Sequence, residues 1–105
     1  MSLAKSLAKL CRELRGEVDE GENKVVCRLP EPVDMELRVD SNRVVLSLGK
    51  RFVLPKPRRM IVLISPRYSI STMTLVERDL TLMNTVARSI AVTVLSGETC
   101  LLIAP

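Results

Sequence analysis

The first sixteen residues place apolar side chains at the spacing of an α-helix. Four leucines recur at intervals of four, three and four residues, which puts them on one face of a helix. These leucines are Leu3, Leu7, Leu10 and Leu14. Ser2 is suited to cap this helix and Gly16 to end it. A membrane-surface helix would show a similar pattern, but we favour a helix that lies on a sheet.

The next segment predicts a strand that follows an acidic turn. VDEGENK resembles a calcium loop only superficially, because it lacks the alternating oxygen ligands and the closing Glu. We therefore expect a solvated hairpin turn that leads into the strand KVVCRL. Pro30 and Pro32 then interrupt the ladder, because proline has no N–H to donate.

Residues 35 to 54 alternate with the period of β-strands and contain two turn signals. Ser41-Asn42 is predicted to join MELRVD to RVVLSL, and Gly49-Lys50 to join RVVLSL to the next strand as a second two-residue turn. The predicted pairs are Asp40 with Arg43, Leu37 with Leu46, Ser47 with Phe52, and Leu46 with Val53. The predicted core face consists of Met35, Leu37, Val39, Val44, Leu46, Leu48 and Val53. The opposite, partly polar face consists of Glu36, Arg38, Asp40, Arg43, Val45, Ser47, Phe52 and Leu54.

A stiff connection precedes the most apolar run. Two prolines make residues 55 to 57 extended. MIVLI then shows no alternation, which predicts a strand that is covered on both faces and is central in the sheet.

The last third of the chain supports two interpretations. Thr74 and Glu77 form a capping-box pattern at the start of a heptad-like seam. The seam consists of Val76, Leu80, Met83, Ala87, Ile90 and Val94. However, SIAVTVL is β-branched and alternating, and SGE could turn it into a hairpin with TCLLIA. We predict a helix over roughly residues 74 to 88 and a closing hairpin over residues 89 to 104.

These elements predict the α+β class in one compact domain over residues 1–105. The expected architecture is an antiparallel β-meander of about four to six strands, packed against the N-terminal amphipathic helix and one C-terminal helix. LPEPVD and the two short strands after it resemble part of the small heat-shock (crystallin-type) sandwich. That family has strands where this chain has a predicted helix, so the resemblance implies only a local strand–turn–strand arrangement.

Composition points to a cytoplasmic protein from a hot environment. The chain has no Gln and no His, and charged residues make up 27% of it, a pattern of thermophilic and archaeal-like proteins. Cys11, Cys27 and Cys100 form no metal motif and predict reduced, buried thiols. The N-terminus lacks the apolar core of a signal peptide, and no apolar run reaches the roughly 20 residues of a membrane helix.

Catalytic patterns are missing from the sequence. Without His the chain has no ordinary general base near neutral pH and no imidazole ligand. None of the four glycines belongs to a phosphate-cradling motif. We therefore expect no enzyme, no catalytic residue, no cofactor and no metal site.

Charge is distributed unevenly along the chain. Eight of the twelve acids lie between residues 13 and 36, whereas the stretch from Arg43 to Val76 holds seven bases and no acid. This asymmetry favours an anionic partner. Arginines beside aromatic rings are typical of surfaces that bind single-stranded DNA or RNA without sequence preference. The candidates are Arg38, Arg43, Lys50, Arg51, Phe52, Lys56, Arg58, Arg59, Arg67 and Tyr68.

On the predicted register, Phe52 would share an exposed face with Arg38 and Arg43 and could stack on a base. In general plan, the chain is similar to small helix-plus-sheet single-strand-binding proteins of hot-living archaea, without a matching motif. The alternative is a non-catalytic homodimeric interaction or assembly subunit, built through the heptad-like seam.

Overall fold

The computed structural model describes residues 2–64 and 81–105, which form one helix and seven strands. The helix α1 spans Leu3–Glu13. The first four strands are β1 (Glu17–Glu20), β2 (Lys24–Val39), β3 (Arg43–Leu48) and β4 (Lys50–Pro55). The last three are β5 (Met60–Ile64), β6 (Thr81–Leu95) and β7 (Glu98–Ala104). The α+β class predicted from the sequence is confirmed.

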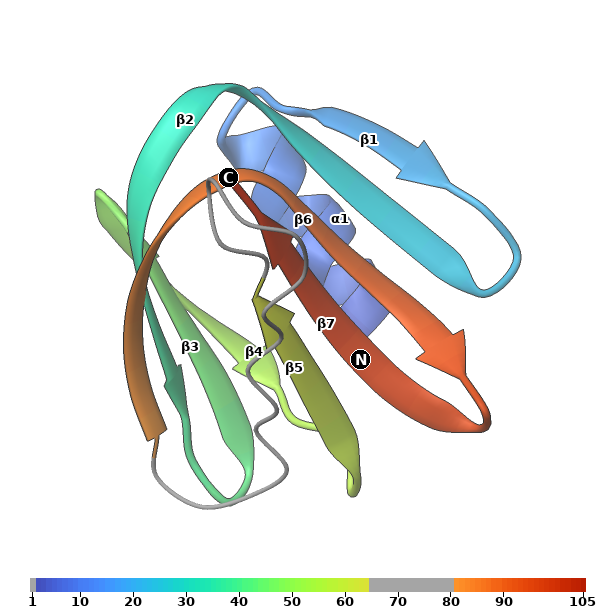
Figure 1. Ribbon diagram of the computed structural model, residues 1–105. Helices are drawn as coiled ribbons and strands as arrows, with labels where there is room; N and C mark the ends of the chain where they lie inside the picture. Colours follow the sequence, from blue (N-terminus) through green and yellow to red (C-terminus); the bar gives the residue numbers. More distant parts are fainter. Residues whose placement is uncertain (1, 65–80) are drawn as a thin grey trace.

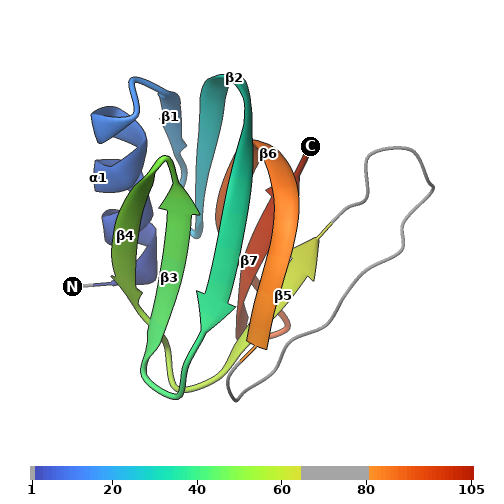
Figure 2. The same ribbon diagram turned by 90° about the vertical axis from the view of Figure 1, so that its left-hand side faces the viewer.

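The strands form a single sheet in the order β4-β3-β2-β6-β7-β5, with β1 paired to the first half of β2. All pairs are antiparallel except β5 with β7. The long strands β2 and β6 bend together, so that the sheet curls (Figure 1). In the view of Figure 2, α1 lies beside β1 and β4. The order departs from the predicted meander, because β6 inserts between β2 and β7.

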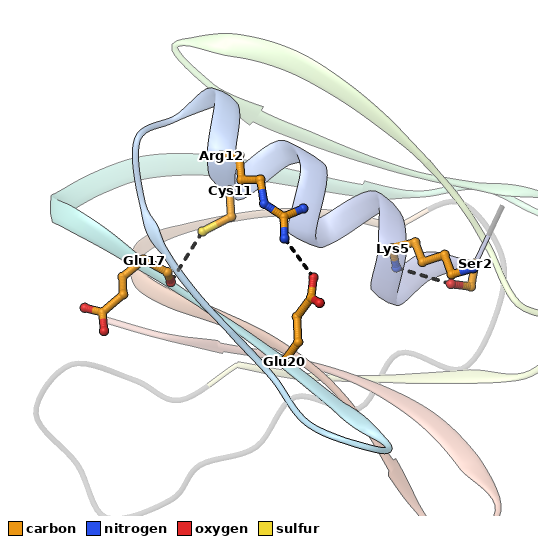
Figure 3. Close-up of polar contacts among 6 residues, drawn as sticks. All are labelled: Ser2, Lys5, Cys11, Arg12, Glu17 and Glu20. Atoms are coloured by element: carbon orange, nitrogen blue, oxygen red, sulfur yellow. Dashed lines mark hydrogen bonds and ion pairs between the residues drawn. The ribbon is translucent and has the colours of Figure 1, made fainter.

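The N-terminal helix forms as the leucine spacing predicts. The side chain of Ser2 caps it by accepting a hydrogen bond from the amide of Lys5, at 3.2 Å (Figure 3). Leu3, Leu7 and Leu10 are buried in the core that α1 shares with the sheet. The amides of Arg15 and Gly16 donate to the carbonyls of Arg12 and Cys11, a Schellman ending in which Arg15 takes the left-handed conformation at φ 59°.

Gly16 is required by close packing rather than by its φ angle. A β-carbon at this position would lie 2.7 Å from the Sγ of Cys11 and 2.8 Å from the carbonyl oxygen of Arg28. Both distances are shorter than real β-carbon contacts. The chain can therefore pass between α1 and β2 only without a side chain.

Cys11 and Cys27 form a disulfide between α1 and β2, so the prediction of three reduced thiols is wrong. Periodicity could not reveal this pair, because the helix and the strand meet only in the fold. Cys100 remains a buried free thiol. The Sγ of Cys11 also lies 3.6 Å from the carbonyl oxygen of Glu17 (Figure 3), to which it can donate only after reduction. Because two of the three cysteines are cross-linked, the cysteines no longer support the expectation of a cytoplasmic protein.

The predicted hairpins differ in outcome. Within VDEGENK, residues 21–23 form the turn between β1 and β2, which is closed by the amide of Gly21 donating to the carbonyl of Lys24 at 2.7 Å, whereas residues 18–20 pair as part of β1. Ser41-Asn42 joins β2 to β3 in the predicted register, with Leu37 opposite Leu46. The third hairpin slips by one residue, because Gly49 alone separates the paired residues Leu48 and Lys50.

The slip exchanges the two faces of β4, since neighbouring side chains of a strand point to opposite sides. Leu46 lies opposite Phe52 and Val45 opposite Val53. Phe52 is therefore buried at 8% exposure, and Val53 is 54% exposed, the reverse of the prediction. The other predicted core positions are correct: Met35, Leu37, Val39, Val44, Leu46 and Leu48 are buried.

The C-terminal helix is wrong wherever the structure describes its residues. Residues 81–88 belong to the strand β6, while residues 74–80 lie outside the described part. The threonine, valine and isoleucine residues of β6 favour a strand, and the long antiparallel pairing with β2 stabilises that conformation. The closing hairpin is confirmed, with Ser96 at φ 50° and Gly97 at φ 77° in a two-residue turn.

MIVLI forms β5, which stands at one end of the order of described strands instead of at its centre. Met60 and Val62 are buried, whereas Ile61, Leu63 and Ile64 are half-buried. The uninterrupted apolar run MIVLI therefore forms a strand with one buried face and a second face that is only partly covered.

Candidate functional site

The outer face of β2, β3 and β4 carries three of the predicted arginines. Arg38 lies opposite Val45, and the next row across the sheet pairs Ser47 with Arg51. Arg43 shares the face of Val45 by strand alternation. All three arginines are exposed. The register slip therefore brings Arg51 to the face where the sequence placed Phe52.

The carboxylate of Asp40 forms ion pairs with two of these arginines. Its carboxylate accepts a hydrogen bond from the Nε of Arg43 at 2.9 Å, and the Nε of Arg38 lies 3.7 Å away. The hydrogen bond from Arg43 lowers the pKa of the Asp40 carboxyl below its ordinary value of 3.8, with a smaller electrostatic contribution from Arg38. Two of the three arginines therefore share one compensating charge.

The Phe52 side chain does not belong to this surface. It lies in the hydrophobic core, where its faces are unavailable to a base. The Nζ of Lys50 lies 5.6 Å from the ring centroid and 3.6 Å from a carboxylate oxygen of Glu13. Lys50 thus covers the edge of the core beside α1 and is not part of the outer face.

The connection between β4 and β5 carries three more candidates. The Nη2 of Arg59 lies 2.8 Å from a carboxylate oxygen of Glu98. The Nζ of Lys56 donates to the carbonyl of Pro57 at 3.3 Å. Arg58 is exposed. Arg67 and Tyr68 lie outside the described residues.

The predicted dimer seam is not a continuous surface along β6. Ala87 and Ile90 are fully buried, Met83 is half-buried and Val94 is 46% exposed. Residues at helical spacing fall on both faces of a strand. Val76 and Leu80 lie outside the described residues.

A second basic surface involves residues that the sequence did not single out. Arg15, Arg28 and Arg88 line one open depression of about 650 Å³, together with Glu17, Leu29, Pro30 and Ser89. The three arginines lie on separate segments of the chain, so no local pattern predicts their approach. The only local signal is the pair of prolines that interrupts the strand beside them.

Within the described ranges, no group of three or more cysteine and carboxylate side chains is placed to hold a metal ion. No helix among the described residues is long and apolar enough to cross a membrane. No family model matches the chain, and no curated protein or solved structure matches it significantly.

Proposed function

We propose that the protein binds single-stranded nucleic acid without catalysis and largely without sequence preference, by contacts to the phosphate backbone. The observation that carries this proposal is the position of Arg51 on the same outer face as Arg38 and Arg43. Guanidinium groups on adjacent strands can bind successive phosphates and release the counterions around them. Lys56 and Arg58 follow β4, but Lys56 lines a separate depression with Ser2, Leu3 and Ala4 at the start of α1 and does not extend this face.

The burial of Phe52 changes the expected kind of binding. Without base stacking by this ring, affinity depends mainly on phosphate contacts and therefore on salt concentration. Three phosphate contacts, from Arg38, Arg43 and Arg51, predict a slope near −2 for log K against log salt, because each contact to a single strand contributes roughly −0.7.

The test is a salt series with a labelled single-stranded oligonucleotide, followed by fluorescence anisotropy. Arg51→Gln should lower affinity and reduce the magnitude of the salt slope by about 0.7. Asp40→Asn should raise affinity, because it releases Arg38 and Arg43 from their shared carboxylate. The control is Arg12→Gln, whose guanidinium on α1 pairs with Glu20 at 3.0 Å (Figure 3). Absence of binding at low salt would refute the proposal.

A homodimeric assembly subunit is the second candidate, supported by the exposed apolar end of the β6–β7 hairpin. Val94 and Leu95 are 46% and 50% exposed beside the turn at Ser96-Gly97. Light scattering over a concentration series tests this alternative. Val94→Lys should shift a dimer towards monomer, and a monomer at all concentrations would exclude it.

A further inference from the structure

Three structural features bring Arg15, Arg28 and Arg88 to one depression. The first is the disulfide, because Cys27 immediately precedes Arg28 and Cys11 lies in the last turn of α1, four residues before Arg15. The cross-link holds the end of the helix against β2. The left-handed conformation of Arg15 then turns the chain out of the helix beside Arg28.

The second feature is the close passage of Gly16 against β2. A β-carbon at Gly16 would be 2.8 Å from the carbonyl oxygen of Arg28. The following residue, Glu17, pairs directly with Arg28 in the β1–β2 ladder. The two residues that follow Arg15 are therefore in direct contact with the backbone of Arg28.

The third feature is an interruption of the β2–β6 ladder opposite Arg88. Arg28 pairs with Ser89, and the next pair joins Val33 to Ala87. Residues 29–32 of β2 therefore face a single residue of β6, Arg88. Such bulges redirect side chains and occur beside functional sites. Here the two prolines remove N–H donors, which explains why regular pairing stops at this point.

The charges around the depression favour an anion. The Nη1 of Arg28 lies 3.9 Å from a carboxylate oxygen of Asp19. Glu17 is also among the residues that line the depression. Among the described acids, none lies within ion-pair distance of Arg15 or Arg88. The carbonyls of Cys11 and Arg12 at the helix end already accept hydrogen bonds from the amides of Gly16 and Arg15. They therefore do not present unsatisfied acceptors to an anion.

We propose that Arg15, Arg28 and Arg88 form a binding site for a phosphate group. Guanidinium groups fit this ligand because each presents a planar set of donors that can bind two phosphate oxygens. Glu17 opposes binding through its negative charge and limits affinity. The inference does not rest on the proposed nucleic-acid function, since it involves none of the outer-face arginines.

An NMR titration of the oxidised protein with inorganic phosphate at low salt tests the site directly. We expect saturable shifts of the amide signals of Gly16 and Ser89. Arg88→Gln should weaken binding about tenfold, the effect of losing one charge-assisted hydrogen bond. Glu17→Gln should strengthen it. Arg12→Gln, close in sequence but outside the depression, should leave the affinity unchanged.

Three further ligands identify the source of the phosphate: glycerol phosphate, an oligonucleotide with a 5′-phosphate and the same oligonucleotide without it. Preference for the phosphorylated end over the internal phosphodiesters would assign the site to a terminal phosphate. Arg51→Gln should weaken oligonucleotide binding on the outer face and leave the inorganic phosphate titration unchanged. Absence of saturable shifts, or equal affinities of the parent protein and a folded Arg88→Gln variant, would overturn the proposed site.

Discussion

The acid-free stretch that begins at Arg43 and the depression at the end of α1 differ from what the charge pattern of the sequence suggests. Arg43, Lys50 and Arg59 come from the stretch without acids, yet each has an acid partner in the fold: Asp40, Glu13 and Glu98. Arg15 comes from the acid-rich stretch, yet it has no acid within ion-pair distance among the described residues.

Charge segregation along a chain is therefore a poor guide to charge segregation in space. Antiparallel pairing and the packing of α1 bring distant segments together, and the partners of a charge are chosen by that geometry. Glu13 and Glu98, which are far away in the sequence, pair with two of the seven bases of the acid-free stretch. The depression collects arginines from three segments.

The largest expected effect tests the register that defines the outer face. Phe52→Ala should lower the free energy of unfolding by about 3–5 kcal/mol, because it removes a buried ring and leaves a cavity. Arg51→Ala, its neighbour on the exposed side, should change it by less than about 0.5 kcal/mol. Urea denaturation measures both. A larger effect at Arg51 than at Phe52 would restore the register in which the ring is exposed.

The second-largest expected effect concerns the disulfide that joins α1 to β2 next to Arg28. Reduction of the Cys11–Cys27 disulfide should lower the free energy of unfolding by about 3 kcal/mol, the loop-entropy value for a separation of 16 residues. Denaturation with and without reductant measures the difference. A Cys11→Ser/Cys27→Ser protein should be insensitive to reductant. Equal stability of the oxidised and reduced parent would show that the cross-link does not hold this end of the molecule.

The passage beside the disulfide is expected to be sensitive to a single methyl group. Gly16→Ala should cost about 1–3 kcal/mol, because the new carbon would overlap a cysteine sulfur and the backbone of Arg28. Gly21→Ala is a matched control, since its nearest neighbour would lie at an ordinary 3.6 Å. Thermal denaturation of the two variants separates crowding from the general effect of replacing glycine. Equal melting temperatures would argue against the close contact.

The smallest effect involves Asp40 on the outer face. Arg43→Gln should raise the pKa of the Asp40 carboxyl towards 3.8, because it removes the hydrogen bond that lowers it. A carboxyl with a lowered pKa stabilises the fold above its unfolded-state pKa and loses this contribution as pH falls through the folded-state value. Carboxyl NMR titration checks the shift. An unchanged pKa in the variant would show that Arg43 is not its main partner.

The sequence predicted local structure well where a single element contained the signal. The leucine spacing and Ser2 predicted α1, and Ser41-Asn42 predicted the β2–β3 register. Gly49 was recognised as a turn residue, but a one-residue difference in loop length reversed the assignment of Phe52 and Arg51. The heptad-like seam was misleading, because Ile90 and Val94 lie among β-branched residues that favour a strand, whatever the spacing of the seam.

The sequence by itself determined which segments can bury an apolar face, where most turns fall and how many charges the molecule carries. Those properties depend on residue type and on spacing within a few turns or strand residues. Only the tertiary structure decided that Cys11 meets Cys27, that Lys50 meets Glu13, and that Arg15, Arg28 and Arg88 line one depression. These contacts depend on strand order, register and the position of α1, which arise from packing of the whole chain.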